Sequence, residues 1–302
     1  SIHIRSLVTA FQKLGCQMQV VTTNKDEEII SHAPFPVLKP SPDKITKTLL
    51  KNWRELELNQ NLTKEVGYVL QNSVLERMLL KLYYKERFDF IYERYSLWSM
   101  AGAKVAAKLK IPFLLEVNSP LVEEQKEFRS LDLVSLALAI QKLNFDLADK
   151  IIAVSEDVKE YITDKGVPAK RVVVLPNAVD PQIFNPKTSN GQHQKMLSFL
   201  PQDHFVIGFV GSLKPWHGVK ILVEAFKKLL HKDKTYHLLI VGEGPERKYL
   251  EQIQTKRNLN GSVTLVGSVE HDQIPGLLRK MDVAVAPYPV LGHFYFSPIK
   301  LF

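Results

Sequence analysis

The stretch Phe205-Val206-Ile207-Gly208-Phe209-Val210 is apolar at every position, and Gly211 follows it directly. A strand that is apolar on both sides is typical of a parallel sheet covered by helices on both faces. Apolar residues at helical spacing over about residues 218–231 come next, and a second apolar run follows at 237–241. The chain after residue 204 therefore predicts a parallel α/β domain.

The same alternation of helix and strand extends in both directions from this run. Downstream, the periodicity predicts a helix over 245–258, a strand over 263–266, a helix over 271–280 and a strand over 282–286. Upstream, helices are expected over 3–14, 49–87 with a break near 59–61, 99–110, 121–149 and from the N-cap candidate Ser155 to about 165. The upstream strands are expected over 19–23, 90–92, 111–115, 151–154 and 171–175, with irregular chain over 24–48.

A proline-rich, polar stretch over residues 176–203 separates the two series of elements. We therefore predict an N-terminal Rossmann-like domain over 1–180, a linker over 181–203 and a C-terminal Rossmann-like domain over 204–302. The first series opens on a helix and the second stops early. The first strand of one domain and the end of the other are thus expected outside these residues, and the 302 residues alone are expected to be inactive.

The composition is that of an ordinary globular protein and excludes several classes. The 302 residues are 45% hydrophobic and 24% charged, which excludes collagen and intrinsic disorder. The single cysteine, Cys16, excludes an intrachain disulfide scaffold and favours a reducing compartment. No charge-free stretch reaches the roughly 20 residues of a membrane-spanning helix.

The net charge of +8 is unevenly distributed along the chain. Residues 1–180 hold 25 Lys and Arg against 23 Asp and Glu, whereas residues 181–302 hold 15 against 9. The basic second half suits an anionic ligand such as a nucleoside diphosphate, or an acidic membrane surface, and a solvated basic face is the alternative. Nucleic acid is disfavoured as a partner because no basic run has interleaved aromatic residues.

Ligands of open α/β sheets bind at the carboxyl ends of the strands, so the loops there are the candidate sites. In the second half these loops are residues 211–218, 242–246 and 267–270, and the segment 287–302. A plain turn is the alternative for each of the first three, and for 267–270 it is the favoured interpretation. The Gly-x-Gly at 242–244 is not a dinucleotide fingerprint, because the position of the third glycine holds Arg247.

In the first half, charged and amide side chains also follow predicted strands. Glu93-Arg94-Tyr95 follows the strand over 90–92, and Glu116-Val117-Asn118 follows the strand over 111–115. Such residues are as often structural as functional, and His3 alone reads as a surface histidine. No His, Cys, Asp or Glu residues have metal-ligand spacing, so no metal site is expected.

Several of these segments together resemble glycosyltransferase family 4, the group 1 glycosyltransferases of GT-B fold. The resemblance covers essentially the whole chain and is strongest over 149–302. It is carried by residues 151–155, 174–180 with Phe184, 209–213, 217–219, 239–245 and 266–269. Residues 91–95 and 115–120 resemble bacterial members that build exopolysaccharide or other surface glycans.

The resemblance implies an activity and its partners. It implies transfer of a hexose, with retention at the anomeric carbon, from a UDP-, GDP- or ADP-sugar to a hydroxyl of a glycan or a lipid-linked acceptor. The family generally needs no metal and no resident cofactor, because cationic side chains and helix N-termini neutralise the leaving diphosphate. The expected place of action is the cytoplasm, at the inner face of the membrane if the acceptor is lipid-linked.

The resemblance also implies roles for individual residues. The donor would be bound by Gly211, Ser212, Lys214, His217, Gly242, Gly244, Val269, Ser297, Pro298 and Lys300, with Lys214 on the diphosphate and Val269 beside the base. The catalytic set would comprise Glu93, Arg94, Glu116, Asn118 and His293.

Three residues depart from the family pattern. Ser212 stands where the family often has Arg, His217 where it often has Lys, and Tyr295 where the first glutamate of the family's E-x7-E motif would stand. Two alternatives therefore remain open: a non-catalytic protein of the same fold that binds nucleotides or glycans, and a nucleotide-sugar epimerase or sugar phosphorylase. An NAD-dependent oxidoreductase is opposed by the missing third glycine.

Overall fold

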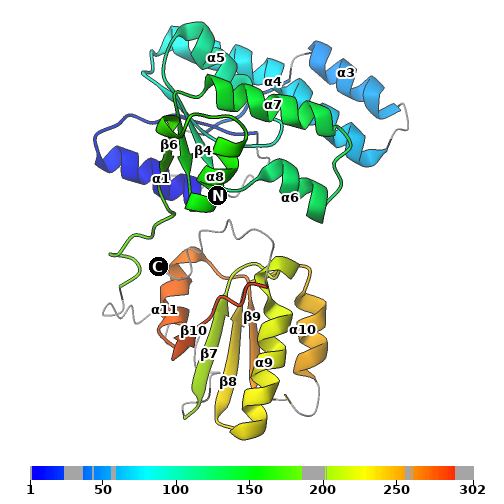
Figure 1. Ribbon diagram of the computed structural model, residues 1–302, viewed down its shortest axis with the longest axis vertical. Helices are drawn as coiled ribbons and strands as arrows, with labels where there is room; N and C mark the ends of the chain where they lie inside the picture. The colour runs from blue at the N-terminus through cyan, green and yellow to red at the C-terminus, as the bar shows by residue number, and fades with distance from the viewer. Residues whose placement is uncertain are drawn as a thin grey trace. The chain divides into compact units, whose positions relative to one another are not determined.

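The computed structural model describes residues 2–23, 37–42, 44–55, 59–185, 201, 203–255, 259 and 261–289. The chain divides into two compact units, Ser1–Pro176 and Asn177–Phe302. Each unit is built on a parallel sheet with helices packed on it (Figure 1), which confirms the predicted α/β class.

The sheet of the N-terminal unit has four parallel strands in the order β3-β4-β5-β6. These are β3 (Ile91–Arg94), β4 (Phe113–Val117), β5 (Lys150–Ala153) and β6 (Val172–Val174). In β3 and β4 the register pairs Arg94 with Glu116. A separate two-stranded parallel sheet is formed by β1 (Val20–Val21) and β2 (Val37–Leu38).

Helices cover both faces of this four-stranded sheet. One face packs against α5 (Ala101–Leu109) and α7 (Val134–Leu147), and α8 (Glu156–Asp164) contacts β5 and β6. The other face meets α1 (Ile2–Lys13), where the ring of Phe11 lies 5.8 Å from the ring of Tyr92. Ser155 caps α8 as predicted, because its side chain accepts a hydrogen bond from the Val158 N–H.

Helix α4 (Gln60–Lys85) supplies buried polar side chains that begin two other helices. The Glu65 carboxylate accepts hydrogen bonds from the backbone N–H groups of Asp132 at 3.0 Å and Leu133 at 2.8 Å, at the start of α7. The Asn72 side-chain oxygen accepts from the N–H groups of Met100 at 2.8 Å and Ala101 at 3.1 Å, at the start of α5. Each side chain thus accepts hydrogen bonds from the backbone at the point where a helix begins.

Two parts of the predicted helix pattern are wrong in detail. The helix predicted over 121–149 is two helices, α6 (Leu121–Phe128) and α7, because the carboxylate of Glu65 starts the second one. The N-cap residue of α7, Leu133, makes no side-chain cap. The local sequence therefore gives no signal for the break between α6 and α7. The stretch predicted to be irregular over 24–48 contains β2 and the beginning of α3 (Lys44–Glu55). The break between α3 and α4 is confirmed, with the Asn59 side chain capping α4.

The sheet of the C-terminal unit has four parallel strands in the order β10-β7-β8-β9. They are β7 (Phe205–Val210), β8 (Tyr236–Val241), β9 (Val263–Gly267) and β10 (Val283–Ala284). All four lie where the sequence predicts strands, and no strand end differs from its predicted position by more than two residues.

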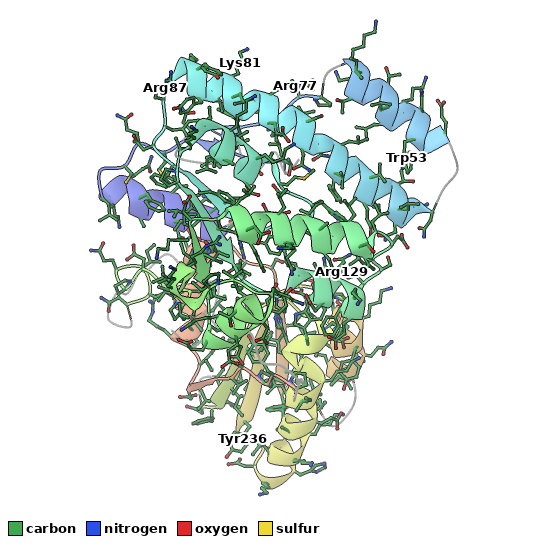
Figure 2. All side chains as sticks on the ribbon, turned by 45° about the horizontal axis from the view of Figure 1, so that its top comes forward. Trp53, Arg77, Lys81, Arg87, Arg129 and Tyr236 are labelled. Atoms are coloured by element: carbon green, nitrogen blue, oxygen red, sulfur yellow. The ribbon has the colours of Figure 1, made fainter. Side chains whose placement is uncertain are left out.

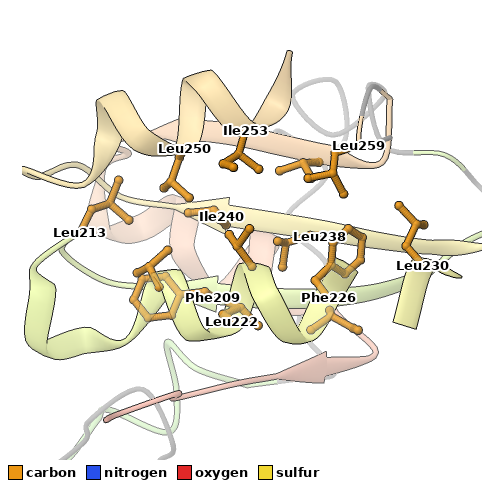
Figure 3. Packing of buried hydrophobic residues seen from close by; sticks show 14 residues of the cluster. Phe209, Leu213, Leu222, Phe226, Leu230, Leu238, Ile240, Leu250, Ile253 and Leu259 are labelled. Atoms are coloured by element: carbon orange, nitrogen blue, oxygen red, sulfur yellow. The ribbon is translucent and has the colours of Figure 1, made fainter. Parts of the chain in front are cut away.

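The side chains of successive residues in these strands pack into two different hydrophobic cores, one on each face of the sheet. Phe209, Leu238 and Ile240 pack with α9 (Val219–Lys232) and α10 (Arg247–Gln254), in the cluster that Figure 3 shows. Leu239 and Val241 pack on the opposite face with Leu277 of α11 (Ile274–Leu278). Short 3-10 turns complete the described elements: η1 (Ala169–Arg171), η3 (Pro215–His217) and η4 (His271–Gln273), the last of which replaces the first turn of the helix predicted over 271–280.

Candidate functional site

The strand order of the C-terminal unit has a switch point between β7 and β10. The chain runs from β7 outward through β8 to β9 and then returns to the other side of β7 to form β10. In open α/β sheets the ligand crevice lies at the carboxyl ends of the strands at such a point. The segments there are residues 211–218 after β7 and 285–289 after β10. They approach closely, since a Cβ on Gly218 would lie 1.6 Å from the carbonyl oxygen of Pro287.

The loop after β7 holds two of the predicted donor-binding side chains. His217 is fixed through Nδ1, which lies 2.5 Å from the carbonyl oxygen of Ser212. Because a carbonyl oxygen only accepts, this contact places a proton on Nδ1. The His217 ring also lies 5.8 Å from the ring of Tyr288. The ammonium of Lys214 lies 5.9 Å from the centre of the Trp216 ring, so one short loop carries both predicted side chains.

Helix α9 begins where this loop ends. Its N-cap residue, Gly218, has φ of 68° and makes no side-chain cap, so the first-turn N–H groups have no side-chain acceptor from the cap. Such N–H groups and the helix dipole favour an anion. Lys220 in the first turn adds a cation, whose ammonium lies 2.8 Å from the carboxylate of Glu246. Lys220 was not among the predicted site residues.

The predicted glycines allow the backbones of neighbouring loops to approach each other closely. Gly242 has φ of 139°, and a Cβ there would lie 2.0 Å from the carbonyl oxygen of Gly211. A Cβ on Gly244 would lie 2.7 Å from the carbonyl oxygen of Leu213. The Leu213 N–H donates to the Glu243 carbonyl oxygen at 2.8 Å, so the loops after β7 and β8 form one unit. A side chain at either glycine would separate them.

Of the remaining residues predicted to bind the donor, only Val269 lies within the described part of the chain. Val269 is half-buried and packs on the core that contains Leu277. A role beside the base stays a prediction. The predicted residues His293, Ser297, Pro298 and Lys300, and the departing Tyr295, lie outside the described residues.

In the N-terminal unit, the predicted residues gather around the carboxylate of Glu116. Its side chain is 4% exposed, and the ring Nε2 of His3 lies 2.8 Å from Oε1. The Tyr92 phenol donates to Oε2 at 2.6 Å, and the Asn118 amide donates to Oε1. The Nε of Arg94 lies 3.8 Å from Oε1. Four side chains from α1, β3 and the end of β4 thus converge on one buried acid.

These contacts set the charge of the cluster. Burial alone would raise the pKa of Glu116, but hydrogen bonds from His3, Tyr92 and Asn118, and the nearby charge of His3, lower it to about 2. Burial and the bond to Glu116 together raise the pKa of the Tyr92 phenol. Glu116 is therefore an anion at neutral pH, suited to accept hydrogen bonds or to stabilise positive charge and not to donate a proton.

Glu93 lies on the other face of the same strand. A Cβ on Gly102 would lie 2.1 Å from Oε2 of Glu93, so the carboxyl sits against the first turn of α5. Burial raises the pKa of Glu93, against hydrogen bonds from the Ser99 side chain and the Gly102 backbone that lower it. The structure thus brings together Arg94, Glu116 and Asn118 but not Glu93. For Glu93 these contacts favour a positioning role at the start of α5.

Prediction from sequence missed Tyr92 and gave His3 too little weight. The alternation of side chains along a strand could have indicated that Tyr92 lies near Glu116. Residues 92 and 94 share a face of β3, and the parallel neighbour β4 brings position 116 beside position 94. Nothing in the sequence joins His3 to Glu116, because their contact spans 113 positions.

Two features are absent from the described residues. No group of three or more His, Cys, Asp or Glu side chains in this part of the chain is arranged to hold a metal ion. Within the same ranges, no helix combines the length and the apolar character needed to cross a bilayer.

Comparison with protein families gives two matches that follow one another along the chain. Residues 1–183 match the family described as Glycosyltransferase Family 4. Residues 193–294 match the family described as Glycosyl transferases group 1.

Curated relatives match over part of their length. The 2-deoxystreptamine glucosyltransferase of Streptomyces kanamyceticus is 26% identical over 196 residues, covering 63% of this chain and 51% of the relative. The UDP-Gal:alpha-D-GlcNAc-diphosphoundecaprenol alpha-1,3-galactosyltransferase of Escherichia coli is 28% identical over 216 residues, covering 69% and 54%. The chain thus spans about half the length of the curated relatives it matches.

Solved structures share the fold. The structure of HepE from Anabaena in complex with UDP has a TM-score of 0.65 at 17% identity, covering 96% of this chain and 70% of that one. The sucrose-phosphate synthase of Thermosynechococcus elongatus has a TM-score of 0.65 at 19% identity, covering 98% and 70%.

Proposed function

Because the chain belongs to glycosyltransferase family 4, we propose that it transfers a sugar from a nucleoside-diphosphate sugar to an acceptor hydroxyl. Its two parallel-sheet α/β units are of the GT-B type, which the resemblance predicts. In the reaction, the bond between the anomeric carbon and the diphosphate oxygen breaks. A bond from that carbon to the acceptor oxygen forms, and the acceptor hydroxyl loses its proton.

One observation carries the donor half of this proposal. At the switch point of the C-terminal sheet, the ammonium of Lys214, the ring of His217 and the first turn of α9 belong to one continuous loop and helix. The ammonium of Lys214 and the helix N-terminus favour an anion, and one segment at the end of β7 supplies both of them beside the His217 ring. A diphosphate bound there would be neutralised as it leaves, which is the largest electrostatic demand of the reaction.

This arrangement also supports two finer points of the proposal. Metal independence follows if Lys214, His217 and the α9 N-terminus supply the positive charge that the leaving diphosphate needs. Retention at the anomeric carbon is implied by the family resemblance. Both are proposals for this chain.

We place the acceptor near Glu116, Arg94 and Asn118. The buried Glu116 carboxylate holds Arg94 and Asn118 in place, and these two side chains can donate hydrogen bonds to sugar hydroxyls. The Escherichia coli relative is named for a diphosphoundecaprenol-linked acceptor. A glycan or lipid-linked acceptor at the inner face of a membrane is our proposal for this protein, and exopolysaccharide or surface-glycan synthesis is its proposed setting.

The test is a donor screen on the full-length protein. Thermal shifts with UDP, GDP and ADP and their sugars identify the base, starting with UDP because the HepE structure contains it. Product analysis with lipid-linked and free glycan acceptors then measures transfer. Release of nucleoside diphosphate only when an acceptor is present supports the proposal, and stabilisation by none of these nucleotides refutes it.

A non-catalytic binding protein is the second candidate, favoured by Ser212 and His217. Where the resemblance leads one to expect Arg and Lys, the loop holds a hydroxyl and an imidazole whose Nδ1 is engaged by a carbonyl oxygen. Tight nucleotide binding without turnover would support this candidate. Epimerisation of the donor without an acceptor would instead indicate a nucleotide-sugar epimerase.

A further inference from the structure

The N-terminal unit has a groove away from the candidate site, between β2 and the C-terminal half of α4. Its volume is about 580 Å³. Apolar side chains line its floor: Leu38, Val74, Met78 and Leu82. Cationic side chains line its rim, and all four are exposed: Lys39, Arg77, Lys81 and Lys85. We refer to it as the cationic groove.

The sequence of α4 produces this arrangement by its period. Apolar positions 74, 78 and 82 and cationic positions 77, 81 and 85 each repeat every four residues, so they form adjacent stripes along the helix. Figure 2 labels Arg77 and Lys81 along α4. Among the described residues that line the groove no side chain is acidic, and of the rim cations Lys85 pairs with the adjacent Glu86 at 3.1 Å. The groove therefore combines positive charge with aliphatic surface.

Exposed apolar side chains also occur on α3 and near the end of α4. Ile45 and Leu49 of α3 are one turn apart and are 71% and 51% exposed, and Tyr84 near the end of α4 is 69% exposed. Lysines at 44, 47 and 51 accompany them on α3. Large apolar side chains in water beside cations are typical of helices that lie at a membrane interface.

We propose that the cationic groove docks this unit on a bilayer that contains anionic phospholipids. The lipid phosphates would pair with the rim cations, and the upper part of the acyl chains would cover the apolar floor. Charge complementarity argues for an anionic partner, and the aliphatic floor argues for lipid over nucleic acid, which stacks its bases on aromatic side chains. Docking on a membrane rests on the proposed function, because that proposal includes an acceptor linked to a membrane lipid.

Vesicle flotation with the full-length protein tests the proposal without any sugar donor. Vesicles of phosphatidylcholine alone are compared with vesicles that contain about one third phosphatidylglycerol, at low salt. The test variant is Lys39→Gln/Lys81→Gln. The matched control is Lys108→Gln/Lys126→Gln, which removes two exposed lysines of the same unit away from the groove. Thermal melting checks that both variants fold.

We expect binding to the anionic vesicles only, weakened about ten-fold or more by the test variant and unchanged in the control. Equal binding of the two variants, or equal binding to both kinds of vesicle, overturns the proposal. Release by about 10 mM glycerol phosphate also overturns it, because a soluble phosphate does not replace the acyl chains. Since no donor is present, failure here is distinct from failure of the transferase assay.

Discussion

The phenol of Tyr92 donates a hydrogen bond of 2.6 Å to Oε2 of Glu116, from one strand of the N-terminal sheet to its parallel neighbour. Burial favours the protonated form of Glu116. This bond and those from His3 and Asn118 keep the carboxylate ionised. The first two predictions follow from this contact.

Stability should fall in acid as Glu116 takes up a proton. Its pKa is lowered from 4.5 to about 2 on folding, so its contribution is fully present above pH 4.5 and is lost as the pH falls toward 2. The full contribution is about 3 kcal/mol. Urea unfolding between pH 7 and pH 2 measures it, and Glu116→Gln should flatten the profile in this window. An unchanged profile in that variant would show that other carboxyls dominate.

Tyr92→Phe should destabilise the N-terminal unit by about 1–2 kcal/mol, because it removes one hydrogen bond to a buried carboxylate. It should also raise the pKa of Glu116 and shift the acid transition to higher pH. Tyr84→Phe is the matched control, since that tyrosine is 69% exposed. Equal unfolding free energies for the two variants would exclude a role for the phenol.

Lys214→Ala should weaken binding of a nucleoside diphosphate by about 1–3 kcal/mol, the usual contribution of a charge-assisted hydrogen bond. Lys228→Ala removes an exposed lysine further along α9 and should leave binding unchanged. Calorimetry with UDP and GDP on the full-length protein makes the comparison. Unaltered affinity of the Lys214 variant would remove this residue from the diphosphate site.

Gly218→Ala should reduce both stability and nucleotide binding. The new Cβ would lie 1.6 Å from the carbonyl oxygen of Pro287, so the loops at the switch point must separate. Gly261→Ala is the control, with a similar φ of 80° and no atom within 4 Å, and should show only the backbone strain of about 1 kcal/mol. Thermal melting and UDP binding distinguish the two effects. Similar losses in both variants would mean that the contact with Pro287 is unimportant.

Glu65→Ala should destabilise the N-terminal unit by about 1–3 kcal/mol, because two backbone N–H groups at the start of α7 lose their acceptor. Glu127→Ala, at an exposed position of α6, is the control and should change stability little. Urea denaturation followed by circular dichroism measures both. A loss as small as in the control would show that water replaces the carboxylate at no cost.

The parts of the fold predicted correctly are those with strong local patterns. The run over 205–210 is apolar on both sides and forms the strand that feeds two cores. The glycine loops after β7 and β8 were also found from sequence, because chain direction alone places them at one edge of the sheet.

The parts that sequence did not predict depend on distant contacts. The break before α7 is set by Glu65, and no residue near 133 signals it. The opposite orientations of Glu93 and Arg94 follow from strand alternation, but a strand of four residues with uncertain ends does not reveal which face will hold α1.

Helix α4 carries Glu65 and Asn72 seven residues, about two turns, apart, and each begins a different helix of the same unit. Docking of α4 thus supplies acceptors for backbone N–H groups where α5 and α7 begin. The three helices should therefore form and melt as one cooperative block, and hydrogen exchange should report a single opening free energy for them.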